Sequence, residues 1–304
     1  QEDEAINVRA SNLFAGLFVV LVLFQFIDKL TQSRPLAVIG CLAYLSSPGI
    51  FIRSCFATHF GYTACFFVLL AYQHVFRATW SSGNRRGQWV ALLPGFLAGL
   101  INQKLIILVF VIYLSHLWQN LRMKEKAGPW WSRFCSEPIT LGYILGLTAF
   151  SIYGLSTNYQ AFYLSFIRVH TLDRILPGHS MFAADYPALL TLWREFVVEF
   201  PLGLFAVPCL GFAMWQYRLK PVAVLAAWFV VGALVFSVVD WKLTYHLMYL
   251  VPPCIILMML TIGNLRPKFR NFAQSAILAG IVFNLVMDVA LLIDFRTYLP
   301  TGGW

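Results

Sequence analysis

"SVVDWKLTYHLMYLVPPCIIL", residues 237–257, sets an acid, an indole, an ammonium group, a phenol and an imidazole between two runs apolar enough for lipid. Apolar runs of roughly 17 to 25 residues recur along the chain, and each is long enough to cross a bilayer as a helix. The 304 residues are 60% hydrophobic and 12% charged, far more apolar than a water-soluble domain needs. The sequence therefore predicts an all-α integral membrane protein, with residues 1–304 forming a single polytopic domain.

Ten transmembrane helices are expected, together with a partly helical outer loop near 155–196. The expected helices span residues 11–28, 36–52, 57–76, 88–101, 104–118, 138–154, 197–216, 221–239, 244–263 and 272–293. The expected helices 88–101 and 104–118 are short, so a re-entrant hairpin is an alternative interpretation of these two segments. Because the chain starts with Gln1 and shows neither a start Met nor a signal peptide, we expect it to be processed or to be a fragment.

The basic residues indicate the orientation when the loops are assigned alternately to the two sides. Fourteen of the 22 Lys and Arg residues fall on one side: Lys29, Arg34, Arg77, Arg85, Arg86, Arg122, Lys124, Lys126, Arg133, Arg218, Lys220, Arg266, Lys268 and Arg270. Cytoplasmic loops carry an excess of Lys and Arg, so this side is expected to be cytoplasmic. Both ends of the chain are then expected on the outer side, either periplasmic or lumenal. A bacterial inner membrane and an ER-type membrane both fit this topology.

Acids and histidines sort the opposite way. The acids assigned to the outer side are Glu2, Asp3, Glu4, Asp173, Asp185, Glu195, Glu199, Asp240 and Asp294, and Asp288 lies near that end of the last helix. The histidines on this side are His59, His170, His179 and His246. Any chemistry is therefore expected at the outer face.

Motifs of soluble enzymes are absent, since the chain has no P-loop, GxGxxG, HExxH or GxSxG sequence. The six cysteines have no CxxC spacing and are interpreted as small core residues, so no metal site is expected. A net charge of +9 is attributed to cytoplasmic loops, and no nucleic-acid partner is expected. The sequence requires no cofactor, although a divalent cation would be compatible with a phosphate site.

Residues 240–246 hold the polar groups of the opening stretch. Trp and Tyr at a membrane boundary are often simple anchors, which is the alternative interpretation of Trp241 and Tyr245. Lys242 lies on an acid-rich face beside a helix start, where free N–H groups favour an anion, so it suits a phosphate. Asp240, Tyr245 and His246 are expected to line the same site, and His246 would add a hydrogen bond or transfer a proton.

Other ionisable groups are expected at the same outer level. Arg53 and His59 flank another outer turn, although Arg53 would also fit as a snorkelling side chain that reaches lipid phosphates. Lys104 follows a Gly-bearing helix and would add a second cation, unless it belongs only to a tight turn. Pro252 and Pro253 are expected to break the helix 244–263 and to make it line an interior.

The loop 155–196 mixes aromatic and charged residues, so we expect short interfacial helices and turns. Loops of this length tend to be functional, although a surface cap without chemistry is the alternative. No internal repeat is evident, and this weakens a transporter interpretation.

In this order, the segments resemble the polytopic glycosyltransferases of the GT-C type. The resemblance is to the dolichyl-phosphate-mannose–protein mannosyltransferases and the bacterial aminoarabinose transferases. It extends from "INVRASNLFAGLFVVLVLFQFIDKL" through "GFLAGLINQKLIILV" to "DWKLTYHLMYLVPPCIILMML". Its most specific elements are Gly99-Leu100 with Lys104, and Lys242 with Tyr245-His246 and Pro252-Pro253.

The resemblance implies an enzyme that takes a sugar from a polyprenyl-phosphate carrier and passes it to a lipid, glycan or protein acceptor on the outer side. The reaction needs a base for the acceptor hydroxyl and cations for the departing phosphate. Lys242, Lys104 and Arg53 are the candidate cations. The acceptor-side contacts are expected in the long outer loop, at Asp173, Arg174, His179 and Asp185.

Two departures from the family pattern concern the base. In the family, an acidic residue of the first outer loop follows a first transmembrane helix, whereas "EDE" here stands only a few residues before an apolar run. Glu2, Asp3 and Glu4 are therefore expected to be the tail of that loop, with Asp3 or Glu4 as the base unless the base lies upstream. Where relatives often place an Asp, this chain has Thr58 and His59.

Three alternatives remain open from the sequence. The first is an enzyme of the O-antigen polymerase or ligase type, which uses similar substrates. The second is a transporter or flippase without covalent chemistry, for which buried charges near the bilayer midplane would be expected. The third is a non-catalytic scaffold subunit.

Overall fold

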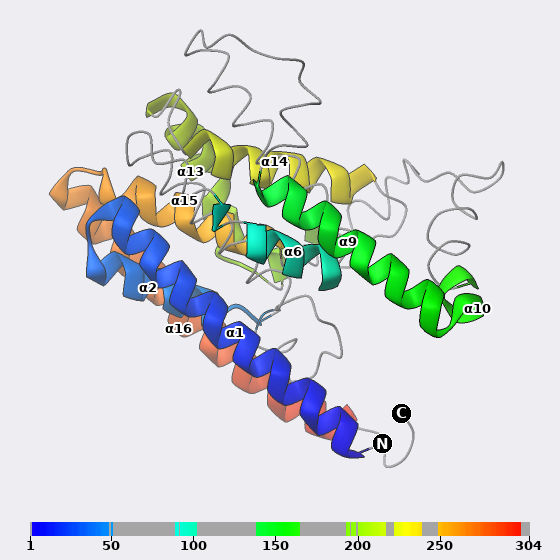
Figure 1. Cartoon of the computed structure of the whole chain (residues 1–304). Coiled ribbons are helices and arrows are strands. Elements are labelled where there is room, and N and C mark those ends of the chain that lie inside the picture. The colour runs from blue at the N-terminus through cyan, green and yellow to red at the C-terminus, as the bar shows by residue number, and fades with distance from the viewer. Residues whose placement is uncertain are drawn as a thin grey trace, which may run out of the picture.

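The computed structural model has helices joined by short turns, and no strand, in the residues that it describes, which are 2–48, 50, 89–90, 92–101, 138–164, 193–194, 196–198, 200–216, 222–238 and 249–298. Within these ranges the helices are α1 (Glu2–Thr31), α2 (Arg34–Leu45), α6 (Leu92–Ile101), α9 (Pro138–Thr157), α10 (Tyr159–Phe162), α13 (Gly203–Gln216), α14 (Val222–Val238), α15 (Val251–Gly263) and α16 (Pro267–Tyr298). α1, α2, α13, α14, α15 and α16 pack together as a bundle, and α6 and α9 pack against each other as a pair of their own (Figure 1). The expected all-α class is confirmed, whereas the expected helices 57–76 and 104–118 lie outside the described residues.

α1 and α2 form an antiparallel hairpin with a short turn. α1 ends where Gln32 adopts a left-handed backbone (φ 52°), and its side-chain amide donates to the Lys29 carbonyl oxygen at 2.8 Å. A left-handed residue after the last turn is a common way to stop a helix. α2 then begins with Arg34-Pro35, because a proline fits the first turn of a helix.

α15 is the centre of the bundle. All residues from Val251 to Ile262 are buried, and the helix packs against α1, α2, α13, α14 and α16. A helix that is apolar on every side is stable only when it is surrounded in this way. At Gly40 of α2 the packing is tight, since an added Cβ would lie 2.5 Å from Ile27 Cδ1 and 3.0 Å from Met259 Cγ.

α6 and α9 form a second closely packed pair through glycines spaced four apart. Gly95 and Gly99 of α6 face the backbone of Ile139 and Tyr143, while Gly142 and Gly146 of α9 face the backbone of α6. Small residues at this spacing let two helix backbones approach closely, as in membrane helix pairs. Residue numbers rise together along the contact, so the two helices run parallel.

α16 has an apolar outside and a partly polar inside. Val282, Phe283, Val286 and Val289 are each more than half exposed, whereas Asn284 and Asp288 are buried. This is the reverse of a water-soluble helix and is typical of a helix that faces lipid. Among the described helices, Pro138–Thr157 and Pro267–Ala290 are long and apolar enough to cross a membrane.

Candidate functional site at one end of the bundle

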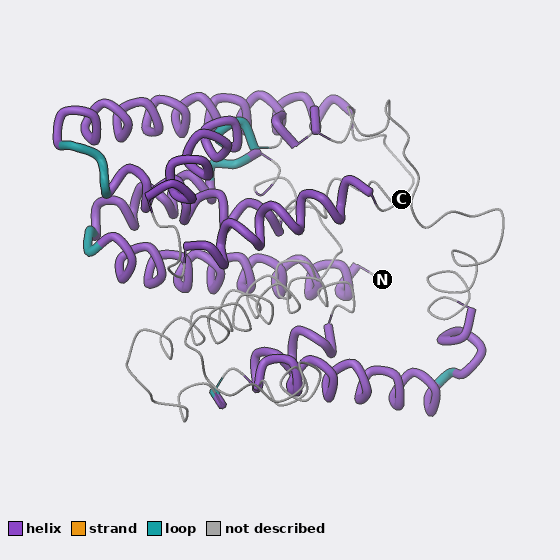
Figure 2. Tube along the Cα trace, turned by 90° about the horizontal axis from the view of Figure 1, so that it is seen from above, coloured by secondary structure: helices purple, strands orange, loops and turns teal. Residues whose placement is uncertain are grey.

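The described charges define two different ends of the bundle. We call one the basic end, because it carries the cations that flank the ends of α1, α2, α15 and α16: Lys29, Arg34, Arg266, Lys268 and Arg270. At this end Gly263 of α15 lies beside Leu36 and Thr31. α1 begins and α16 ends at the opposite end, which we call the termini end. Figures 1 and 2 show both of these helix ends on the same side of the bundle.

α14 ends and α15 begins on the side of the termini end, and the residues between them in the sequence, 239–248, include Asp240, Lys242, Tyr245 and His246. α15 finishes at the basic end, so its start at Val251 points toward the termini end. α13 approaches the basic end, since Cys209 near its middle accepts a hydrogen bond from Thr261 Oγ1 at 3.3 Å. Only residues 217–221 separate α13 from α14, and such a link spans about 20 Å at most, so α14 runs back toward the termini end.

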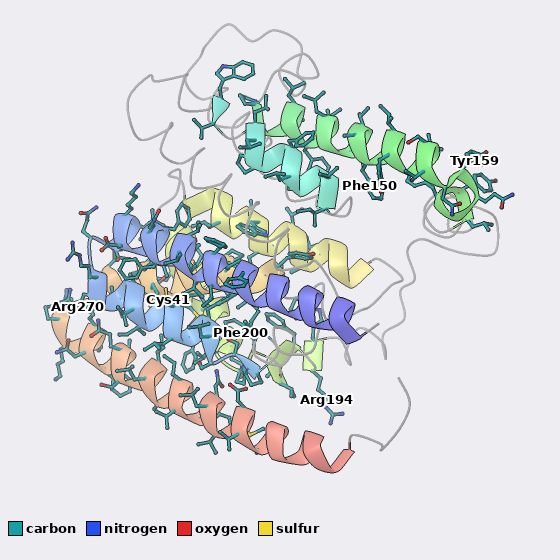
Figure 3. The ribbon with its side chains drawn as sticks, turned by 60° about the horizontal axis from the view of Figure 1, so that its bottom comes forward. Cys41, Phe150, Tyr159, Arg194, Phe200 and Arg270 are labelled. Atoms are coloured by element: carbon teal, nitrogen blue, oxygen red, sulfur yellow. The ribbon has the colours of Figure 1, made fainter. Side chains whose placement is uncertain are left out.

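α6 and α9 both run toward the termini end, and α9 reaches it. In Figures 1 and 2, α10, which follows α9, lies on the same side of the bundle as the start of α1. Figure 3 shows that Tyr159 of α10 and Arg270 of α16 lie at opposite ends of the molecule. α6 runs parallel to α9 but ends beside its middle, because Leu100 lies against Gly146, and Ile101 is followed in the sequence by Gln103 and Lys104 two and three residues later.

Most of the site residues expected from the sequence lie outside the described residues. This holds for Arg53, His59, Lys104, Asp240, Lys242, Tyr245 and His246, and for Asp173, Arg174, His179 and Asp185 of the long loop. The structure therefore describes the helix ends that flank these residues and not their contacts.

Asp3 and Glu4 lie in a helix and not in the tail of a loop. The backbone from Glu2 onward belongs to α1, which has 30 residues and is about 45 Å long. The expected start near residue 11 marks only where the apolar run begins. Helical hydrogen bonding continues beyond the apolar run, because it depends on the backbone and not on side-chain hydropathy.

Pro252 and Pro253 start α15 and do not interrupt it. They occupy the second and third positions of the helix, where the missing N–H groups would have no intrahelical partner in any case. The described part of the expected helix 244–263, α15, is unbroken, and residues 244–248 lie outside the described residues. The expectation that this helix lines the interior is confirmed, because both prolines and the residues after them are buried.

The described beginning of the long loop is an aromatic corner. α9 ends at Thr157, and α10 folds back so that the Phe162 ring contacts Gly154 and lies 5.7 Å from the Phe150 ring. Tyr159 stacks on Tyr163 at 6.0 Å between ring centroids. Aromatic groups of this kind suit a membrane–water boundary. The expectation of short helical segments in this loop is met at α10 and at 196–198.

A buried polar pair on α16 is the site feature that the sequence did not single out. Asn284 is 0% exposed and Asp288 is 3% exposed, and they lie one helical turn apart. The sequence places Asp288 near the outer end of the last helix and close to the bilayer midplane, and Asn284 is not among the residues that it predicts for a site. The available signal was two polar residues four positions apart in an otherwise apolar span.

Comparisons with known proteins identify the fold. ArnT from Cupriavidus metallidurans, solved with bound undecaprenyl phosphate, matches 95% of this chain with a TM-score of 0.66 and 15% sequence identity. The apo form of the same protein matches 87% of this chain with a TM-score of 0.63 and 16% identity. The chain has the ArnT fold.

ArnT is a GT-C aminoarabinose transferase, so the fold implied by the sequence resemblance is confirmed. The chain is thus an integral membrane protein with a GT-C-like fold. It spans about half of ArnT, since the match covers 57% of that chain in one structure and 47% in the other. No protein-family model and no curated protein sequence matches the chain.

Proposed function

We propose that this chain carries the glycosyl-transfer site of a membrane enzyme that uses a polyprenyl-phosphate-linked sugar as donor. The observation that carries the proposal is the fold shared with ArnT over 95% of the chain, in a structure of ArnT that holds undecaprenyl phosphate. Further support comes from the end of α14 and the start of α15, which flank Lys242 in the sequence and face the termini end of the bundle.

In the proposed reaction, an acceptor hydroxyl oxygen attacks the anomeric carbon of the sugar. The bond between that carbon and the phosphate oxygen breaks, and the polyprenyl phosphate leaves with the electron pair. A carboxylate takes the hydroxyl proton, and Asp3 or Glu4 is the candidate within this chain. Lys242, Lys104 and Arg53 would stabilise the negative charge that develops on the leaving phosphate.

The remaining residues have supporting roles in this proposal. His246 and Tyr245 would donate hydrogen bonds to the donor, Asp240 would orient Lys242, and His59 would lie beside Arg53. The acceptor would approach from the long loop, which holds Asp173, Arg174, His179 and Asp185. We place the reaction on the periplasmic or lumenal side, because the basic end carries the excess of Lys and Arg typical of cytoplasmic loops.

Lys242→Ala tests the proposal directly. The variant should lose transfer from undecaprenyl-phosphate sugars by roughly 100-fold or more, because a charge that stabilises the leaving group is removed. It should keep the thermal stability of the wild type in detergent. Lys220→Ala is the matched control, since Lys220 lies two positions before the start of α14 in the sequence, and α14 begins on the side of the basic end. Wild-type turnover in Lys242→Ala would remove the phosphate role.

A transfer assay in proteoliposomes distinguishes the proposed enzyme from a transporter or flippase. Proteoliposomes that contain the wild-type chain and a labelled undecaprenyl-phosphate sugar should yield labelled acceptor and unlabelled carrier lipid. A transporter or flippase would move the label across the bilayer without forming either product. Removal of divalent cations with a chelator, followed by their return, tests whether a metal ion assists the departing phosphate.

A further inference from the structure

Asn284 and Asp288 continue a buried stripe along α16. From the basic end toward the termini end, the stripe consists of Ile277, Ile281, Asn284 and Asp288, at successive spacings of four, three and four residues. This spacing keeps all four side chains on one face of a helix. On this face the buried side chains are therefore apolar toward the basic end and polar toward the termini end.

The polar atoms of this pair have no hydrogen-bond partner in the described part of the chain. Asn284 Nδ2 and Oδ1 and both carboxylate oxygens of Asp288 are buried without one. Burial of an amide and a carboxyl group without partners strongly opposes folding, and the penalty is larger inside a membrane. Ionisable groups in a transmembrane helix are for this reason candidates for a binding function.

The position of the pair along α16 favours access from the termini end. Asp288 lies two residues before the end of the apolar span Pro267–Ala290, and Asn284 lies about 6 Å deeper. Closer to the basic end, the bare backbone of Gly280 accommodates the Leu202 side chain. Apolar packing therefore closes the route from the basic end.

The donor and acceptor groups of the pair decide which ligand it suits. The carboxylate of Asp288 accepts hydrogen bonds, and the amide of Asn284 both donates and accepts them. Hydroxyl and amino groups complement this set, and hydrogen bonds to a charged carboxylate are the stronger kind. A phosphate does not fit, because its negative charge would face that of the carboxylate.

We propose that Asn284 and Asp288 bind a hydroxyl- or amino-bearing sugar group at the termini end of the bundle. The inference rests on the proposed glycosyl transfer and adds to it a separate place for sugar, distinct from the cations that hold the phosphate. The sugar belongs either to the donor lipid or to a glycan-bearing acceptor. No covalent step is assigned to either residue.

Two variants test the pair in the purified full chain. In Asn284→Leu/Asp288→Leu, apolar groups of similar size replace the unpaired polar groups, so the folded state should be at least as stable as that of the wild type. Asp288→Asn keeps the shape and removes only the charge. Val289→Leu is the control, because Val289 is the neighbouring residue on the exposed face.

The first readout is stabilisation by ligand, measured as a shift of the melting temperature in detergent. The probes are undecaprenyl phosphate, undecaprenyl-phosphate mannose and undecaprenyl-phosphate aminoarabinose. If the pair holds the donor sugar, both variants should respond normally to bare undecaprenyl phosphate. They should lose the extra stabilisation that a sugar-linked probe gives the wild type, with affinity reduced roughly 10- to 100-fold.

The second readout identifies the source of the sugar. Kinetics are measured with a lipopolysaccharide preparation and a Ser/Thr-rich peptide as acceptor probes. If the pair holds an acceptor glycan, the variants should bind all donors normally, and KM for lipopolysaccharide alone should rise by about tenfold. Wild-type donor binding together with wild-type KM and kcat in both variants would overturn the inference.

Failure of this inference is distinguishable from failure of the proposed function. If the wild type transfers sugar and the variants match it, only the inference fails. If the wild type transfers no sugar but gains stability from a sugar-linked probe that the variants do not sense, the inference stands as a binding site and the proposed chemistry fails.

Discussion

Gly146 and Gly16 are both helical glycines, and their surroundings differ in a way that only the packing reveals. An alanine Cβ at Gly146 would overlap the Phe96 carbonyl of α6, whereas one at Gly16 would meet nothing within 4 Å. Gly16→Ala should stabilise the chain by about 0.5 kcal/mol, because alanine favours the helix. Gly146→Ala should destabilise it by roughly 1–3 kcal/mol, since a backbone carbonyl yields little. Apparent melting temperatures in one detergent compare the two, and equal values would contradict the close contact of α6 and α9.

For some residues that the sequence analysis named, the structure gives a different physical reason for the residue type. Gly99 belongs to an element that resembles a glycosyltransferase motif, and it lies against the Tyr143 backbone of α9, so packing alone requires a glycine there. Pro252 and Pro253 suggested a break and instead begin α15. Asn284 gained significance only once its burial was known, because hydropathy does not reveal which face of a helix is covered.

At the scale of the element, the lipid-facing side of α16 predicts how lysine substitutions there affect membrane integration. Leu278 is exposed near the middle of the apolar span, and Phe269 is exposed at its basic end. Leu278→Lys should oppose membrane integration by about 3 kcal/mol, because the ammonium group lies far from either boundary. Phe269→Lys should cost little, since a lysine there reaches the headgroups. The fraction resistant to alkaline extraction measures both, and equal fractions would contradict the membrane position of α16.

The observed ends of some helices agree with the expected ends. The ends of other helices, which hydropathy alone placed, differ from the expected ends. The expected helices 138–154 and 221–239 agree closely with α9 and α14. α1 and α16 extend past the apolar runs 11–28 and 272–293, because a helix can continue through the headgroup region into water. α2 ends at Leu45, before the expected residue 52, and the Ser47 hydroxyl beyond this end donates to the Ala43 carbonyl oxygen at 2.7 Å.

For the whole molecule, the two ends of the bundle should lie on opposite sides of the membrane. Tyr159→Cys on α10 and Lys268→Cys on α16 place thiols at exposed positions of the termini end and the basic end. In intact spheroplasts, a membrane-impermeant maleimide should label Tyr159→Cys, and Lys268→Cys should react only after permeabilisation. Background labelling of the six natural cysteines is measured in the unsubstituted chain. Labelling of Lys268→Cys in intact cells would reverse the proposed orientation.

The sequence by itself determined the class of the protein, because the bilayer admits few solutions for a chain with apolar runs of this length. It also predicted that acids and cations sort to different sides, since loop charge is a local property. Only the tertiary structure decided that α15 is enclosed on all sides, that α6 and α9 touch through their backbones, and that Asn284 and Asp288 face inward. Those features depend on which helix faces meet, and contacts between residues far apart in the chain leave almost no trace in local composition.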